Sequence, residues 1–281
     1  MKKICLIIGS KEYQHKNLSN LPGCEADANN MFQALTDPLL GGYDKGNSCL
    51  LISPTLEKVR DTFDEIFQRN TEIDVFTVSF SGHGGVKTGN LFLCMKNTVT
   101  ERLSTTAFPL SSLFTMLNEV APKQTNIIID ACESGGVVFD LRNIINPELL
   151  GAKDTPGVSI LASAASDQSA KEYPDGSGGY ATRALVECLT GKIRVQSNRP
   201  YLNLVELGTF LSKVIPEAVD GQNPVVWGLN LFGDAFLTNN PHFEGEELSY
   251  SYHLAQIPAS SETGIVIQKE ARVLWDIYQN L

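Results

Sequence analysis

The sequence lacks a long hydrophobic run and an excess of positive charge. Near the N-terminus only residues 4–8 are apolar in succession before Gly9, too few for a signal peptide or a membrane span. Acidic residues outnumber basic ones 32 to 22, and the formal net charge is -10, whereas phosphate binding requires clustered lysines and arginines. We therefore expect no membrane insertion and no nucleic acid partner.

Closely spaced cysteines and phosphate-binding motifs are absent too. The six cysteines are far apart, with no CxxC pair and no CxxC…HxxxH spacing, so the sequence predicts neither a zinc site nor a disulfide scaffold. This cysteine usage fits a reducing, cytoplasmic environment. Neither GxGxxG nor GxxxxGK[ST] occurs, which disfavours a nucleotide-binding α/β protein. No cofactor is expected to be required, and the absence of an EF-hand-like ligand ladder leaves calcium dependence open.

The chain does contain a regular alternation of strand and helix patterns. In residues 56–70 the apolar side chains follow helical spacing and form one stripe, as in an amphipathic helix. Short runs with continuous apolar character lie between such segments, at residues 4–8, 49–52, 75–80, 127–129, 158–162 and 225–231. Strands of this kind joined by helices predict an α/β fold in which a mostly parallel sheet is covered on both faces, a three-layer α/β/α sandwich.

Two of the predicted strands end in loops that carry reactive side chains. His83 stands between Gly82 and Gly84, and Cys132 follows a run of three isoleucines. In an open parallel sheet the ligand site lies beyond the carboxyl ends of the strands. A thiol attacks a peptide carbonyl as the thiolate, so Cys132 needs a base such as His83 within reach. The N–H groups of Gly84 and Cys132 are candidates for an oxyanion hole.

These motifs resemble those of a known family. "SFSGHGG" together with "IIIDACESGG" resembles the caspase-like cysteine peptidases of clan CD, and more specifically the metacaspases and the bacterial homologues called orthocaspases. The resemblance extends over residues 3–240 and includes "LPGCEADANNM" near the N-terminus. The resemblance implies a caspase-like sandwich with a six-stranded sheet, His83 as general base and Cys132 as nucleophile. It also implies that a backbone carbonyl, rather than a carboxylate, orients the histidine.

The departures from the caspase pattern bear on specificity. Caspases that cut after Asp carry an Arg near the place of Leu21 or Pro22 and a Gln at the place of Asp130, so an Asp-specific pocket is not expected. Asp27 and Asp130 instead match acidic positions of the metacaspases. Two carboxylates facing a pocket would select Arg or Lys at P1. The alternatives are a helix N-terminal charge for Asp27 and a strand-end cap for Asp130. Glu133 replaces a His common in metacaspases and receives no role.

The remaining expectations concern domain organisation and substrate contacts. By the resemblance, residues 1–240 form a peptidase domain made of a large-subunit-like part (1–136), a linker (137–157) and a small-subunit-like part (158–240), followed by an extension (241–281). The candidate processing sites in the linker are Arg142 and Lys153. The candidate substrate contacts after the linker are Ser163, Asp167 and Gln168.

We interpret the sequence as that of a cysteine endopeptidase with a preference for a basic P1 residue, made as a regulated precursor. Its expected partners are protein or peptide substrates and an activating protease or regulatory protein, and no metal site is predicted. The alternative from another class is a non-catalytic caspase-like scaffold or interaction module, and the presence of both His83 and Cys132 disfavours it.

Overall fold

The computed structural model describes residues 1–132, 157–164, 170–229, 231 and 236–243. The chain divides into two units, Met1–Pro241 and His242–Leu281. Nearly all the described residues belong to the first unit, and the description below concerns that unit.

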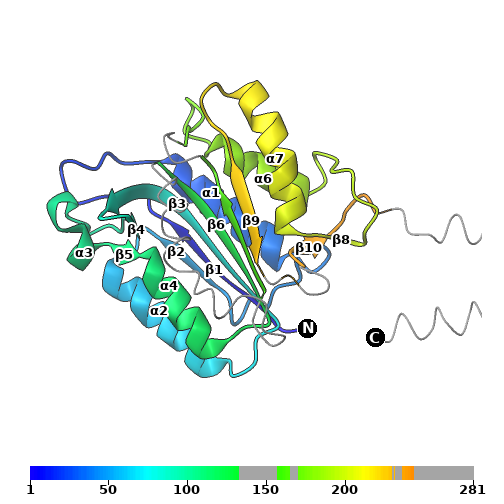
Figure 1. Cartoon of the computed structure of the whole chain (residues 1–281), viewed down its shortest axis with the longest axis horizontal. Helices are drawn as coiled ribbons and strands as arrows, with labels where there is room; N and C mark the ends of the chain where they lie inside the picture. Colours follow the sequence, from blue (N-terminus) through cyan, green and yellow to red (C-terminus); the bar gives the residue numbers. More distant parts are fainter. Residues whose placement is uncertain (133–156, 165–169, 230, 232–235, 244–281) are drawn as a thin grey trace, which may run out of the picture. The chain divides into compact units, whose positions relative to one another are not determined.

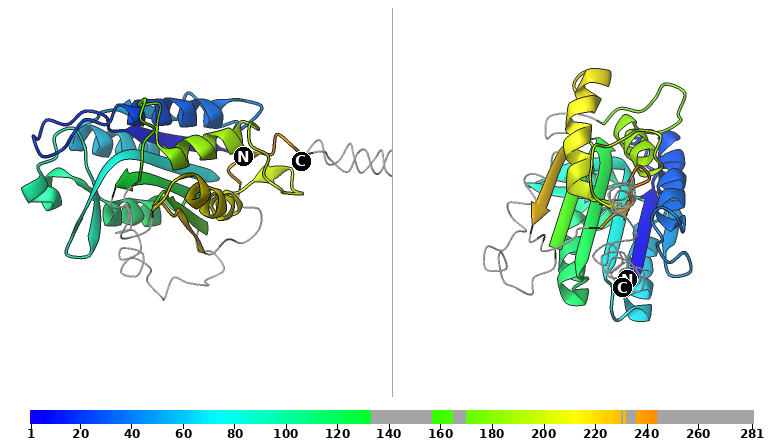
Figure 2. Two further views of the ribbon diagram at one scale, coloured as in Figure 1. Left: turned by 90° about the horizontal axis from the view of Figure 1, so that it is seen from above. Right: turned by 90° about the vertical axis from the view of Figure 1, so that its right-hand side faces the viewer.

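Every apolar run that the sequence pattern assigns to a strand is a strand of one sheet. Six strands lie in the order β2-β1-β3-β6-β7-β9, and the right-hand view of Figure 2 shows β9 at one edge. All the neighbours on this path are parallel except β7 and β9. The bounds are β1 (Lys3–Gly9), β2 (Cys49–Ile52), β3 (Val75–Lys87), β6 (Gln124–Cys132), β7 (Gly157–Ala162) and β9 (Val225–Leu229). The expected mostly parallel, six-stranded α/β sheet is therefore confirmed.

The helices cover both faces of this sheet. α2 (Leu56–Arg69) and α4 (Leu110–Val120) pack on one face, and α1 (Gly23–Thr36), α6 (Tyr180–Leu189) and α7 (Leu204–Ala218) pack on the other. Figure 1 shows α2 with α4 and α6 with α7 on opposite sides of the strands. The sequence signals α2 through its apolar stripe and through Thr55, whose hydroxyl accepts the Lys58 N–H at 3.3 Å as an N-cap.

Two hydrophobic cores fill the space between the layers, because successive residues of a strand point to opposite faces. Ile4, Leu6 and Ile8 of β1 face the core under α2 and α4. Cys5 and Ile7 face the core under α1, α6 and α7. The larger side chains of the first core include Phe63, Phe76 and Phe108, whose rings pack together. Burial on both sides explains why these strands have continuous rather than alternating apolar sequences.

The remaining elements are short. β4 (Asn90–Leu93) turns back on β3 as a hairpin and also pairs with β5 (Phe108–Pro109). A 3-10 turn (Thr100–Arg102) and α3 (Leu103–Thr106) connect these two strands. β8 (Tyr201–Leu202) and β10 (Thr238–Asn239) form a separate two-stranded sheet.

The structure differs from the sequence-based expectation at the end of β3. The apolar run stops at Phe80, which predicts that the glycine-rich segment with His83 is a loop. β3 instead continues as a strand to Lys87, because pairing with β4 satisfies its backbone beyond the apolar part. His83 is thus held by strand pairing.

We predict that Phe63→Ala destabilises the protein by about 3–5 kcal/mol, the usual cost of removing a buried aromatic side chain. Phe63 is 1% exposed and stacks on Phe108 with ring centroids 5.5 Å apart. Urea unfolding followed by circular dichroism measures the change. Leu39→Ala is the control, since Leu39 is 82% exposed and its loss should change the unfolding free energy by about 0.5 kcal/mol or less.

Candidate active site

The carboxyl ends of β3 and β6 bring the two predicted catalytic residues side by side. These strands pair in parallel from Val75 opposite Gln124 to His83 opposite Cys132. Paired parallel strands lie about 4.8 Å apart, so the backbones of His83 and Cys132 are direct neighbours. The Cys132 side chain lies outside the described part of the chain. The strand register alone therefore places both residues at one edge of the sheet.

The imidazole of His83 has a defined environment. Its Nε2 lies 2.9 Å from the backbone carbonyl oxygen of Ser19 and 3.5 Å from the Ser19 hydroxyl. Because a carbonyl oxygen only accepts hydrogen bonds, this contact favours the tautomer with hydrogen on Nε2 and leaves Nδ1 as the basic nitrogen. The ring also lies against Tyr13, with centroids 4.9 Å apart.

Two buried carboxylates lie next to these strand ends. Asp27 comes from α1 and is 3% exposed, and Asp130 comes from β6 and is 6% exposed. Both oxygens of Asp27 accept the Gly179 N–H, at 3.1 and 3.0 Å, and one of them accepts the Ser81 hydroxyl at 3.0 Å. The Asp27 carboxylate thus bonds across the fold to β3 and to the residue before α6. Its contacts are not those of a charge that stabilises its own helix terminus.

Asp130 also lies close to Gly179. The Thr182 hydroxyl donates to its carboxylate at 2.5 Å. Burial raises the pKa of Asp130, while the hydrogen bond from Thr182 acts in the opposite direction. Burial also raises the pKa of Asp27, and the negative charge of Asp130 raises it further. Both acids therefore hold their protons more tightly than carboxyls in water do.

A third carboxylate, Glu172, joins this cluster. The Cys24 thiol donates to Glu172 at 3.5 Å. Burial raises the pKa of Glu172, and the charge of Asp130 acts in the same direction. Glu172 is not among the candidates from the sequence, because no local pattern separates it from a surface glutamate. We call Asp27, Asp130 and Glu172 the carboxylate cluster.

The segment that carries Glu172 is shaped by glycines. Glu172 and Gly179 form a β-bridge, which folds the chain back toward α6. Gly178 has φ +127°, and a Cβ there would collide with Asp27 Oδ1. A Cβ on Gly179 would lie 2.5 Å from Asp130 Oδ2. Glycine is therefore required at both positions for the backbone to reach the two aspartates.

Comparison with solved structures shows what this arrangement is similar to. A protein of Geobacter sulfurreducens covers 86% of this chain with 99% of its own at 17% identity and a TM-score of 0.59. Caspase-1 of Spodoptera frugiperda covers 80% with 86% of its chain at 15% identity, TM-score 0.59. The Drosophila initiator caspase Dronc covers 81% with 79% of its chain at 9% identity, TM-score 0.53. At these identities the matches establish the fold alone.

The sequence itself matches the family model described as the caspase domain, over residues 2–224. The chain belongs to the caspase-domain family. Membership implies a cysteine peptidase acting on proteins, and it agrees with the sheet and helices described above. No curated protein matches the sequence.

The other predicted site residues of this caspase domain divide into two groups. Ser163 is buried beside Asp130, and Gly84 follows His83 within β3 and pairs with Leu93. The other positions lie outside the described residues, namely Asp167, Gln168, Arg142 and Lys153. Also outside are 133–136 of the large-subunit-like part, 137–156 of the linker and 244–281 of the extension.

The described residues also bear on metal binding and membrane insertion. Among them, no group of three or more His, Cys, Asp or Glu side chains is arranged to hold a metal ion. No helix in that part of the caspase domain has the length and apolar content needed to cross a membrane.

The carboxylate cluster makes stability depend on pH. In the unfolded chain these carboxyls ionise near pH 4, as aspartic acid does in water, whereas folding raises the pKa of Asp27 and Asp130. Their contribution to stability is thus fully present below about pH 4 and is lost as the pH rises through the folded-state pKa values.

The unfolding free energy of the wild type should fall between pH 5 and pH 8 as these acids ionise. We predict that this fall is smaller in Asp27→Asn by about 1–3 kcal/mol, at 1.36 kcal/mol per pKa unit. Urea titrations at both pH values measure it. Asp74→Asn is the control. The ion pair of Asp74 with Lys123 lowers the Asp74 pKa, so Asp74 ionises below pH 5 in both states. An unchanged pH dependence in Asp27→Asn would contradict the assignment.

Proposed function

We propose that this caspase domain is a cysteine endopeptidase of the metacaspase type, which cleaves after Arg or Lys with His83 and Cys132 as its dyad. One observation carries the proposal: buried acidic side chains adjoin the strand ends at which His83 and Cys132 are paired neighbours. A thiol and a base serve peptide hydrolysis generally. The adjoining acids select the residue that precedes the cut.

The mechanism proceeds in two stages. Nδ1 of His83 takes the proton of the Cys132 thiol, and the sulfur attacks the substrate carbonyl carbon. The N–H groups of Gly84 and Cys132 stabilise the oxyanion. When the peptide C–N bond breaks, the imidazolium returns its proton to the leaving amine, and the acyl group stays on sulfur as a thioester. A water molecule then attacks the thioester while His83 takes one of its protons. His83 gives that proton to the departing sulfur.

The Ser19 carbonyl supports both stages. Its contact of 2.9 Å with Nε2 of His83 fixes the ring orientation and stabilises the imidazolium, as a carboxylate does in other dyads and triads. This contact agrees with the resemblance, which implies a backbone carbonyl in that position.

The selectivity for a basic P1 residue follows from burial. Removing Asp27 and Asp130 from water without a cation is costly, and their raised pKa values lessen this cost by favouring the protonated form. A guanidinium forms paired hydrogen bonds with carboxylates and keeps its charge at every relevant pH. Glu172, which is less buried, adds a third acceptor. A P1 arginine thus supplies the missing charge and displaces the proton.

Regulation and domain organisation remain proposals from the sequence. Residues 1–136 and 158–240 are the two peptidase parts, 137–157 is the linker between them, and 241–281 is an extension. Cleavage after Arg142 or Lys153 is the activating step. A protease that cuts after basic residues would be able to make these cuts itself or receive them from an activating protease. We place the protein in the cytoplasm, where an unregulated protease would be harmful and activation by cleavage would restrain it. A non-catalytic scaffold is the alternative.

We predict that matched fluorogenic peptides with Arg or Lys at P1 are cleaved and that those with Asp or Leu are not. Activity should vanish in Cys132→Ala and in His83→Ala, because each removes one member of the dyad. The assay, run with calcium and with chelator, also decides whether calcium is required.

The other outcomes separate the alternatives. Cleavage after Leu or Asp would retain the peptidase and refute the basic P1 preference. Silence on every peptide calls for a second assay on protein nicked in the 137–157 linker. Activity there would establish a precursor, and continued silence would favour the scaffold.

We predict that Glu172→Gln lowers kcat/KM for a P1 arginine peptide about tenfold, chiefly through KM, since it removes one charge from a partly buried cluster. The variant keeps a hydrogen-bonding side chain of similar size. Glu65→Gln is the matched control, because Glu65 is exposed on α2 and pairs only loosely with Arg69 at 3.8 Å. An unchanged KM in Glu172→Gln would remove Glu172 from the substrate pocket.

A further inference from the structure

The backbone of β3 changes its pairing partner at His83. On the side toward β1, parallel pairing ends with Gly9 opposite Ser81, and the Ser10 N–H still donates to the Ser81 carbonyl at 2.8 Å. On the same side, antiparallel pairing with β4 begins with Gly84 opposite Leu93. The His83 carbonyl accepts from the Cys94 N–H at 2.9 Å. The His83 N–H thus lies between the β1 pairing and the β4 pairing, and neither strand supplies an acceptor for it.

The side chain of Tyr13 fills this position. Its hydroxyl oxygen accepts the His83 N–H at 2.8 Å, so the donor left between the ladders is satisfied. The Tyr13 ring lies at 52° to the His83 imidazole, with centroids 4.9 Å apart. A Cβ on Gly82 would come within 2.8 Å of the Tyr13 hydroxyl, so glycine at 82 admits this side chain. One tyrosine therefore contacts both the backbone and the ring of the same histidine.

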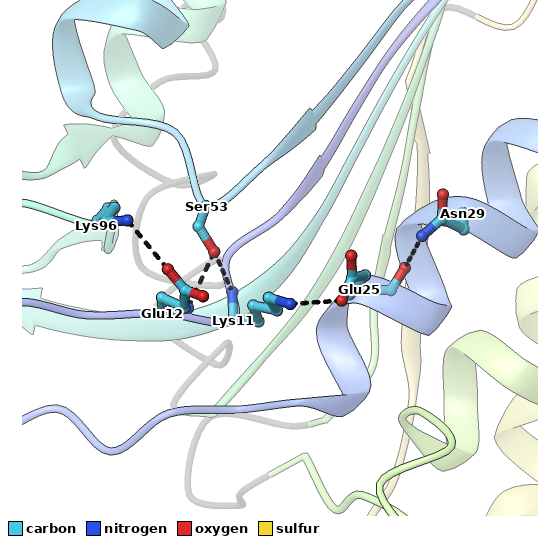
Figure 3. A network of polar contacts seen from close by, with 6 residues as sticks. All are labelled: Lys11, Glu12, Glu25, Asn29, Ser53 and Lys96. Atoms are coloured by element: carbon cyan, nitrogen blue, oxygen red, sulfur yellow. Dashed lines mark hydrogen bonds and ion pairs between the residues drawn. The ribbon is translucent and has the colours of Figure 1, made fainter.

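The segment that carries Tyr13 is held firmly. The backbone N–H groups of Lys11 and Glu12 donate to the Ser53 hydroxyl at 3.2 and 3.0 Å. The Glu12 carboxylate pairs with Lys96 at 3.0 Å, and Figure 3 shows these contacts together. The Tyr13 N–H donates to the Asn20 side chain at 3.1 Å. The same segment carries Ser19, so its anchoring fixes both partners of His83.

We propose that Tyr13 is a positioning residue that holds the His83 imidazole between its own ring and the Ser19 carbonyl. The proposal rests on the proposed function in that it assigns His83 the role of general base. The structural alternative is that Tyr13 is only a packing residue, since its ring also lies on a small cluster that includes Phe92, Cys94 and Leu103. Burial raises the Tyr13 pKa, so its hydroxyl stays neutral over the range of an assay.

Tyr13→Phe separates positioning from packing, because it keeps the ring and removes the acceptor for the His83 N–H. With the P1 arginine peptide, kcat should fall about 10- to 100-fold, the scale of a misplaced catalytic group, while KM stays unchanged. The pH dependence of Cys132 alkylation by iodoacetamide should also shift, because it reports the interaction between thiol and imidazole.

Tyr43→Phe is the matched control. Tyr43 is a buried tyrosine whose hydroxyl shares a hydrogen bond of 2.7 Å with Thr77 of β3, far along the strand from His83. This variant should lose stability but keep the wild-type kcat and alkylation profile. If Tyr13→Phe matched Tyr43→Phe in both kcat and alkylation profile, Tyr13 would be a packing residue and the proposal would be overturned.

A measurement without substrate keeps this test separate from that of the proposed function. The chain has 4 histidines, so the imidazole C–H signal of His83 is assigned by NMR through its loss in His83→Ala. Tyr13→Phe should shift and broaden that signal, and Tyr43→Phe should not. If the wild type cleaved no peptide even after nicking of the 137–157 linker, the proposed function would fail, and the signal would still decide whether Tyr13 positions the ring. An unmoved signal would overturn the inference in either case.

Discussion

The parallel pairing of β3 with β6 is the constraint on which the rest of the structure depends. Its register runs unbroken from Val75 opposite Gln124 to His83 opposite Cys132. Side chains of β3 and β6 alternate between two cores, so a shift of one residue would move each set of side chains into the core that it does not fit. Hydrophobic packing along the whole strand pair thereby fixes the relative position of two polar residues at its end.

The carboxylate cluster depends on that same register. Asp130 lies two residues before Cys132 on β6, and its neighbour Asp27 is brought from α1, which packs on the same sheet face as α6 and α7. Such buried acids cost folding free energy, and the cost is tolerated because hydrogen bonds from Ser81, Gly179 and Thr182 satisfy the oxygens. Under the proposed function, the negative charge of this cluster serves to recognise a basic P1 side chain.

Two segments outside the regular elements complete the site. Residues 10–22 follow β1 and bring Tyr13 and the Ser19 carbonyl to His83. The stretch before α6 brings Glu172 and two glycines to the aspartates. Each segment is fixed by hydrogen bonds to residues distant in sequence. The scaffold is therefore determined by hydrophobic packing, and the details of the site by polar contacts.

The sequence by itself determined the sheet, its principal helices and the meeting of His83 with Cys132. Strand and helix periodicities are local properties, and the carboxyl ends of parallel strands necessarily share one edge. Only the tertiary structure decided that β3 continues past His83 to Lys87, because this requires pairing with β4. It alone revealed the places of Glu172 and Tyr13, whose contacts join residues 148 and 70 positions apart. No local pattern encodes contacts at such separations, since they exist only after the layers have packed.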